Sequence, residues 1–234
     1  MPKDATPHVA GLTANQTAAA MQAARLTALD LMDSADLLYT HKRFAHSLAL
    51  STLAIEEAGK LPLLQSIFLG FAGDQIGLWK SYRSHRAKTG GLNVAIQARI
   101  RATFPQIPVA EARASGDVGP TPKELETNKQ RAVYSDCLTM DREFVCHLPR
   151  NVDWRQQAWE RLCEAQAIVH GLRDYSPEEL EVWVRHAKSA RELGGDLRSM
   201  LQALHKELLK EGFVKEGWWD TMLLDLAEEE NRGI

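Results

Sequence analysis

The sequence predicts an all-α protein, and three observations support this. Apolar residues recur at alternating three- and four-residue spacing over long segments, as on one face of a helix. Three capping boxes mark helix starts, and no strand-length run of alternating β-branched residues interrupts the pattern. With 234 residues, 44% of them hydrophobic, the chain can bury a sizeable core.

The three capping boxes fix where helices begin. In each, a Ser or Thr side chain accepts a hydrogen bond from the backbone N–H three residues later. The Gln or Glu at that later position accepts one from the backbone N–H of the Ser or Thr. The boxes begin at Thr13, Thr121 and Ser176, and proline follows the second and third at the first helical position. The first helix should end near Tyr39, since its apolar face runs that far.

The middle of the chain predicts several shorter elements. A second helix begins near Lys42, and Pro62 kinks or restarts it. A third begins after Asp74 and includes His85, and the helical pattern resumes over residues 92–104. Residues 105–122 hold four prolines and two glycines, which is typical of a mobile loop.

The C-terminal part predicts two further helices. One begins near Asp153, and the other runs from Pro177 past Gly194-Gly195 to Leu208, with Trp218-Trp219 as a terminal cap. We expect a flexible leader at 1–12, a helical bundle at 13–152 and a helical extension at 153–234 that packs on the bundle.

Charge and cysteine content restrict the function classes. Lys and Arg number 28 against 31 Asp and Glu, a net charge of −3, so RNA contacts would have to be local. Three cysteines without C-x-x-C spacing fit neither a disulfide framework nor a zinc knuckle, which favours a reducing cytoplasm. The most apolar stretch, residues 47–73, carries Glu56, Glu57 and Lys60 at its middle, so we expect no membrane segment.

Those three charged residues are the first candidate site. Glu56 and Glu57 point about 100° apart on a helix, so at least one should face protein and need a partner. If the chain reverses near residue 73, Lys60 lies level with His85 and Glu57 with Lys88. Lys60 is three residues after Glu57 and Lys88 is three after His85, so each helix would present its polar pair on one face and the two pairs would converge. We expect Glu57 to lie within salt-bridge reach of Lys88 or Lys60.

Two interpretations of this cluster stay open. It is either an ion-pair network that fixes helix register, or a site where Lys60 and Lys88 hold an anion while His85 transfers protons. A di-iron site is disfavoured because Lys60 stands where Glu-x-x-His needs histidine and no second such motif occurs. We therefore predict no metal ligands and no cofactor.

Three stretches together resemble the AbiV family of abortive-infection proteins, within the HEPN superfamily. They are Arg43-Phe-Ala-His-Ser-Leu-Ala-Leu-Ser-Thr-Leu-Ala-Ile-Glu-Glu-Ala-Gly-Lys60, Trp79-Lys-Ser-Tyr-Arg-Ser-His-Arg-Ala-Lys88 and Lys129-Gln-Arg-Ala-Val-Tyr-Ser-Asp136. The resemblance covers roughly residues 13–153. It implies an up-and-down helical bundle, often a homodimer, that defends bacteria against phage and often acts on RNA.

The resemblance leaves the catalytic residues open. Active HEPN ribonucleases usually carry Arg, four to six residues, then His, whereas Lys80 stands where that Arg would precede His85. Arg142 and His147 have the required spacing and are secondary candidates, placed in a loop or helix before Pro149. Tyr134 and Asp136, expected on the preceding helix, are secondary candidates too, with packing and hydrogen bonding the preferred role.

The expected function is an antiphage abortive-infection effector that acts on RNA or translation. As an endoribonuclease it would use the ribose 2′-hydroxyl as nucleophile, with His85, or His147, as acid or base. The alternative is a non-catalytic helical module that binds a phage or host protein. Catalysis requires His85 and Lys88 to be accessible to solvent, whereas the non-catalytic module allows both to be buried.

Overall fold

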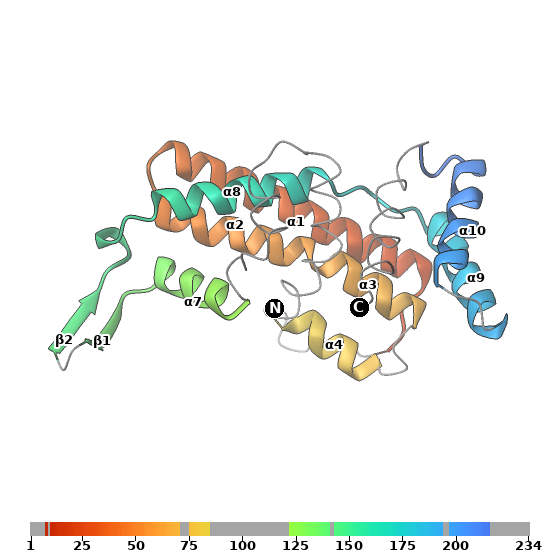
Figure 1. Cartoon of the computed structure of the whole chain (residues 1–234), viewed down its shortest axis with the longest axis horizontal. Coiled ribbons are helices and arrows are strands. Elements are labelled where there is room, and N and C mark those ends of the chain that lie inside the picture. Colours follow the sequence, from red (N-terminus) through yellow and green to blue (C-terminus); the bar gives the residue numbers. More distant parts are fainter. Residues whose placement is uncertain are drawn as a thin grey trace. The chain divides into compact units, whose positions relative to one another are not determined.

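The computed structural model describes residues 8, 10–70, 75–84, 122–140, 143–193 and 197–215. Within these ranges the chain is helical, as predicted, apart from one two-stranded hairpin (Figure 1). The helices are α1 (Ala14–Thr40), α2 (Phe44–Ala58), α3 (Lys60–Leu69), α4 (Gln75–Arg83), α7 (Pro122–Val133), α8 (Arg155–His170), α9 (Pro177–Leu193) and α10 (Leu197–Lys210). The strands are β1 (Asp136–Met140) and β2 (Glu143–His147), and a 3-10 turn, η1 (Pro149–Asn151), follows them.

The chain divides into two compact units, which are described separately. Unit 1 takes its described residues from Met1–Gln22, Pro62–Ser84 and Asp174–Ile234, and unit 2 from Ala23–Leu61 and His85–Arg173. The domain boundaries expected at residues 12 and 152 stay predictions. Within unit 2, however, α8 packs directly against α2 and shares its core.

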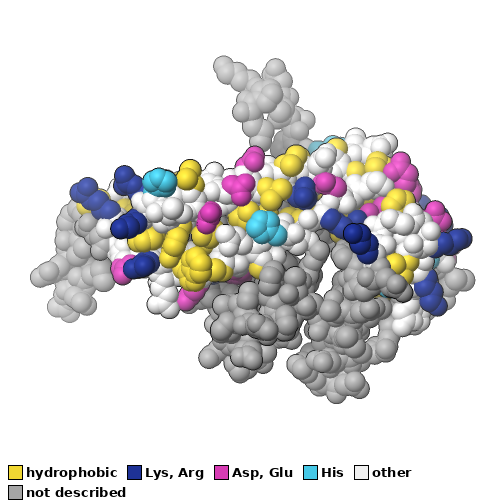
Figure 2. All heavy atoms as spheres, turned by 90° about the horizontal axis from the view of Figure 1, so that it is seen from above, with side chains coloured by type: hydrophobic (Ala, Val, Ile, Leu, Met, Phe, Trp, Pro, Cys, Tyr) yellow, Lys and Arg dark blue, Asp and Glu magenta, His cyan; other side chains and the backbone are white. Residues whose placement is uncertain are grey.

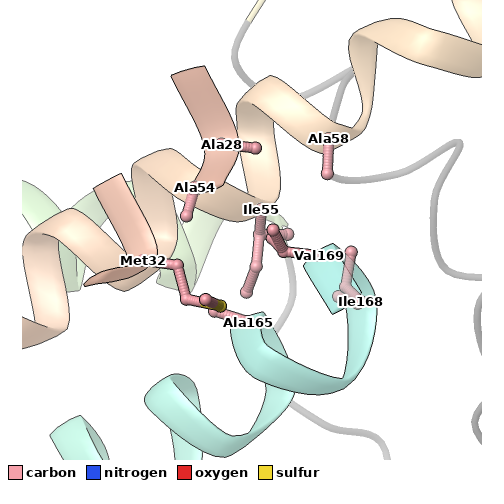
Figure 3. Close-up of a cluster of buried hydrophobic side chains, with 8 residues drawn as sticks. All are labelled: Ala28, Met32, Ala54, Ile55, Ala58, Ala165, Ile168 and Val169. Atoms are coloured by element: carbon pink, nitrogen blue, oxygen red, sulfur yellow. The ribbon is translucent and has the colours of Figure 1, made fainter. Parts of the chain in front are cut away.

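Unit 2 is built on α1, α2 and α8, which run alongside one another (Figure 1). Figure 3 shows their shared core, in which five of the eight buried side chains are alanine or valine, so that the helices approach closely. A second cluster lies around the first turns of α2 and adds α7 and the start of α8. The first cluster comprises Ala28, Met32, Ala54, Ile55, Ala58, Ala165, Ile168 and Val169, and the second Ala45, Leu48, Ala49, Ala132, Trp154 and Ala158.

Unit 1 has its own core, formed by the apolar faces of α9 and α10 with the end of α3. Leu204 and Leu208 of α10 are fully buried there against Val182 and Ala187 of α9. The expected single helix from Pro177 to Leu208 is therefore wrong, because its two halves are separate helices that pack on each other.

The predicted helix starts agree with the structure. Thr13 and Gln16 make both bonds of the capping box, with the Gln16 N–H donating to Thr13 Oγ1 and the Thr13 N–H to Gln16 Oε1. Ser176 Oγ accepts from the Glu179 N–H at 3.1 Å. α2 ends at Ala58 and α3 begins at Lys60, which places Pro62 in a first helical turn, where proline is tolerated.

α2 begins at Phe44, two residues after Lys42, because the α1–α2 turn ends in a left-handed residue. Lys42 has φ 59°, and the Arg43 N–H donates to the Leu38 carbonyl at 2.8 Å, closing α1 as a glycine normally would. Gly212, which follows α10 with φ 77°, is in the same conformation. Lys42 is thus the only non-glycine residue with positive φ in the described ranges.

Lys42→Gly is expected to stabilise the protein. A side chain in the left-handed region costs about 1 kcal/mol, and glycine removes that cost. The midpoint of thermal unfolding should rise by about 2–4 °C for a chain of this size. Gly212→Ala is the matched control and should shift the midpoint in the opposite direction; equal midpoints for all three proteins would contradict the prediction.

The hairpin corrects two expectations. α7 ends at Val133, so Tyr134 and Asp136 are not helical, and Asp136 begins β1. The strands are antiparallel with Asp136 opposite His147 in the register, so the segment before Pro149 is strand rather than loop or helix. The other expectations concern residues outside the described ranges. They are those for Asp74, the end of the third helix at His85, residues 92–104, most of the 105–122 loop and Trp218-Trp219.

Candidate functional site

The two adjacent glutamates at the end of α2 point to different surroundings. Glu56 is buried, with 2% of its surface exposed, whereas about a fifth of the Glu57 side chain reaches solvent. Neighbouring residues on a helix diverge by about 100°, and α2 is enclosed by helices on several sides. The expectation that at least one carboxylate faces protein is confirmed, and Glu56 is that residue.

Lys129 of α7 is the cation that meets Glu56. Its Nζ lies 2.8 Å from Glu56 Oε1 and 2.6 Å from Glu126 Oε2. Burial by itself lowers the pKa of Lys129, but hydrogen bonds and charge from Glu126 and Glu56 outweigh burial and raise the pKa above 10.5. Because this pKa is raised on folding, the stabilising effect is fully present at neutral pH and is lost only in strongly alkaline solution.

The sequence places this triad by helical spacing. Glu126, Lys129 and Ala132 are three residues apart and therefore share one face of α7. Ala132 is fully buried in the cluster with the first turns of α2, so that face is directed at α2. Lys129 was missed as a site residue, although this spacing and its place in the third AbiV-like stretch were visible signals.

Glu57 pairs with Lys60 instead. The distance from Lys60 Nζ to Glu57 Oε2 is 2.6 Å, and both side chains are about one fifth exposed. The pair bridges the end of α2 and the start of α3, so the predicted contact between Glu57 and Lys60 is confirmed. His85 and Lys88 fall outside the described residues, and their convergence on this pair stays a prediction.

The secondary candidates do not form an open catalytic group. His147 is buried, and its Nε2 donates to the Arg131 backbone carbonyl at 2.9 Å, which ties the ring to the end of α7. Tyr134 is 61% exposed, so the packing role expected for it is wrong. Asp136 is the register partner of His147, and Arg142 falls outside the described residues.

The described residues contain no group of three or more His, Cys, Asp or Glu side chains placed to hold a metal ion. None of the described helices combines the length and the apolar character needed to cross a bilayer.

Comparison with known proteins supports one family. The family model for AbiV, of the HEPN type, matches residues 16–170, which include α1, α2, α7 and α8. Neither the curated proteins nor the solved structures include a significant match. Since the family match covers well over half of the 234 residues, the chain belongs to the AbiV family, whose type of function is abortive infection.

Proposed function

We propose that the protein is an antiphage effector that acts as a dimer in the cytoplasm on RNA or the translation apparatus, and that it does so as an endoribonuclease. The observation that carries the proposal is the Glu57–Lys60 pair, a solvent-accessible charged group in the most apolar part of a chain that belongs to the AbiV family. The Glu56–Lys129 pair is buried, as a purely structural ion pair can be, whereas the Glu57–Lys60 pair keeps contact with water.

The proposed chemistry needs no metal. His85 accepts the proton of a ribose 2′-hydroxyl as that oxygen attacks the adjacent phosphate, and a protonated group donates to the leaving 5′-oxygen. Lys60 and Lys88 stabilise the negative charge that grows on the phosphorane. Glu57 holds Lys60 in place until the phosphate competes for it, and this exchange is possible because the pair is partly hydrated.

A second candidate is the non-catalytic module that binds a phage or host protein. Two observations favour it. The buried Glu56–Lys129–Glu126 triad gives Glu56 a structural role, and His147 already uses its Nε2 in a hydrogen bond to the Arg131 carbonyl. The two candidates share the family and differ in whether RNA is cut.

Cleavage of RNA by the purified full-length protein tests the choice. Total RNA is incubated with the protein in the presence of a chelator, with and without an extract of phage-infected cells. We expect cleavage products that end in 2′,3′-cyclic phosphate, because attack by the 2′-hydroxyl produces that end. Intact RNA in both conditions, with a protein that still protects cells from phage, would favour the module.

A further inference from the structure

Three aromatic rings form a continuous row on the surface of unit 2. Tyr39 of α1 lies between Phe44 of α2, at a centroid distance of 5.1 Å, and Trp159 of α8, at 5.5 Å. Tyr39 and Phe44 are partly buried and pack on the apolar cluster beneath them, whereas 53% of Trp159 is exposed. The row is therefore anchored in the core at one end and open to solvent at the other.

Cationic side chains border this aromatic row. Lys42 and Arg43 lie in the turn directly before Phe44, and Arg155 is four residues before Trp159 on the same face of α8. All three are exposed, and no carboxylate of the described residues forms an ion pair with them. Figure 2 shows hydrophobic side chains beside several Lys and Arg side chains at the end of the molecule on the left.

The one carboxylate next to Trp159 in sequence is already engaged. Glu160 Oε1 accepts from Gln156 Nε2 at 3.0 Å along α8. The surface thus combines an exposed indole with cations free to take an external anion, in a protein whose net charge is −3. Asp153, two residues before Arg155, accepts from the Arg155 backbone N–H at 3.0 Å and is engaged as well, so the three side-chain cations can contact an external anion.

We propose that this surface, made of Tyr39, Phe44, Trp159, Lys42, Arg43 and Arg155, binds single-stranded RNA. A base stacks on the Trp159 indole, and the flanking phosphates contact the cations, which is how proteins hold single strands without reading their sequence. The aromatic row beside exposed cations favours an unpaired base over an apolar helix face, because a single strand uses both the indole face and the cations at once. The choice of RNA over DNA rests on the proposed function.

Binding of a non-cleavable oligonucleotide tests this surface apart from catalysis. The probe is a fluorescent 2′-O-methyl oligouridine of about ten nucleotides, a length in the range of known single-strand sites. The methyl group blocks the 2′-oxygen, so the full-length protein binds the probe without cutting it. Trp159→Ala should weaken binding about tenfold, whereas Trp159→Phe should keep most of the affinity.

The cations are tested by salt dependence. Arg43→Gln and Arg155→Gln should each reduce the slope of log affinity against log salt by about 0.7, because each removes one phosphate contact. Leu26→Ala, at an equally exposed apolar residue of α1, and Lys188→Gln, at an exposed lysine of α9, are the matched controls and should bind as the parent does. Trp159 is half exposed, so all variants should unfold at the parent's temperature.

The outcomes separate this inference from the proposed function. Binding that depends on Trp159 and Arg43 supports the surface even if the parent never cuts RNA. Parent-like binding by Trp159→Ala and Arg43→Gln overturns it, even if RNA is cut. A dimer that dissociates in Trp159→Ala with unchanged oligonucleotide affinity also overturns it, because the face would then be covered by a second copy.

Discussion

Lys129→Met is expected to lower the free energy of unfolding by about 3–5 kcal/mol. Methionine fills nearly the same volume but leaves Glu56, which is 2% exposed, without the cation 2.8 Å away. A buried carboxylate that loses its ion-pair partner retains the full desolvation cost. In a chain of 234 residues the unfolding midpoint should fall by roughly 6–20 °C in a calorimetric or circular dichroism melt.

A second variant shows whether the charge or the packing causes the loss. Glu56→Leu combined with Lys129→Met removes both buried charges and should regain most of the stability, because an apolar pair of similar size carries no desolvation cost. Glu126 is a quarter exposed and can be hydrated when Lys129 is gone. A double variant as unstable as Lys129→Met would show that shape, rather than charge, governs this position.

Lys60→Met is the matched control at the partly exposed pair. Glu57 and Lys60 are both about one fifth exposed, so water can hydrate the carboxylate that is left, and the loss should be nearer the ~0–1 kcal/mol of a surface pair than the loss at a sealed one. Removing one charge of the buried Glu56–Lys129 pair should therefore cost more than removing one charge of Glu57–Lys60. If Lys60→Met destabilised the protein as strongly as Lys129→Met, this distinction would be wrong.

The features that the sequence predicted well depend on contacts close in the chain. The bonds between Thr13 and Gln16, and between Ser176 and Glu179, span three residues, so composition at those positions suffices to locate helix starts. The restart at Pro62 is equally local, since proline cannot donate to the preceding turn. The Glu57–Lys60 pair was predictable for the same reason.

The features that the sequence missed depend on distant contacts or weak patterns. Lys129 meets Glu56 across 73 residues, and the spacing that puts Glu126, Lys129 and Ala132 on one face of α7 does not by itself identify the helix that this face meets. The strands of the hairpin have five residues each and are separated by Asp141 and Arg142, which lack the Asn-Gly type of turn signal. α9 and α10 read as one helix because the apolar spacing continues across Gly194-Gly195.

His85→Gln is expected to reduce RNA cleavage by at least about 10²-fold and to abolish protection against phage. Glutamine keeps a hydrogen-bonding side chain of similar length but cannot exchange a proton near neutral pH. Cleavage is measured as initial rates on total RNA with a chelator present, and protection as plating efficiency of phage. The unfolding midpoint of the variant is measured beside the parent and should stay close to it.

Lys129→Met supplies the comparison that separates chemistry from stability. Its activity should follow the folded fraction, so that cooling restores the rate per folded molecule to the parent's value, whereas no temperature restores cleavage to His85→Gln. A His85→Gln protein that protects cells as the parent does would exclude His85 as the proton-transfer group. A His85→Gln protein that loses stability and activity in the same proportion as Lys129→Met would instead place His85 in the structural network, and the non-catalytic module would then be the better account.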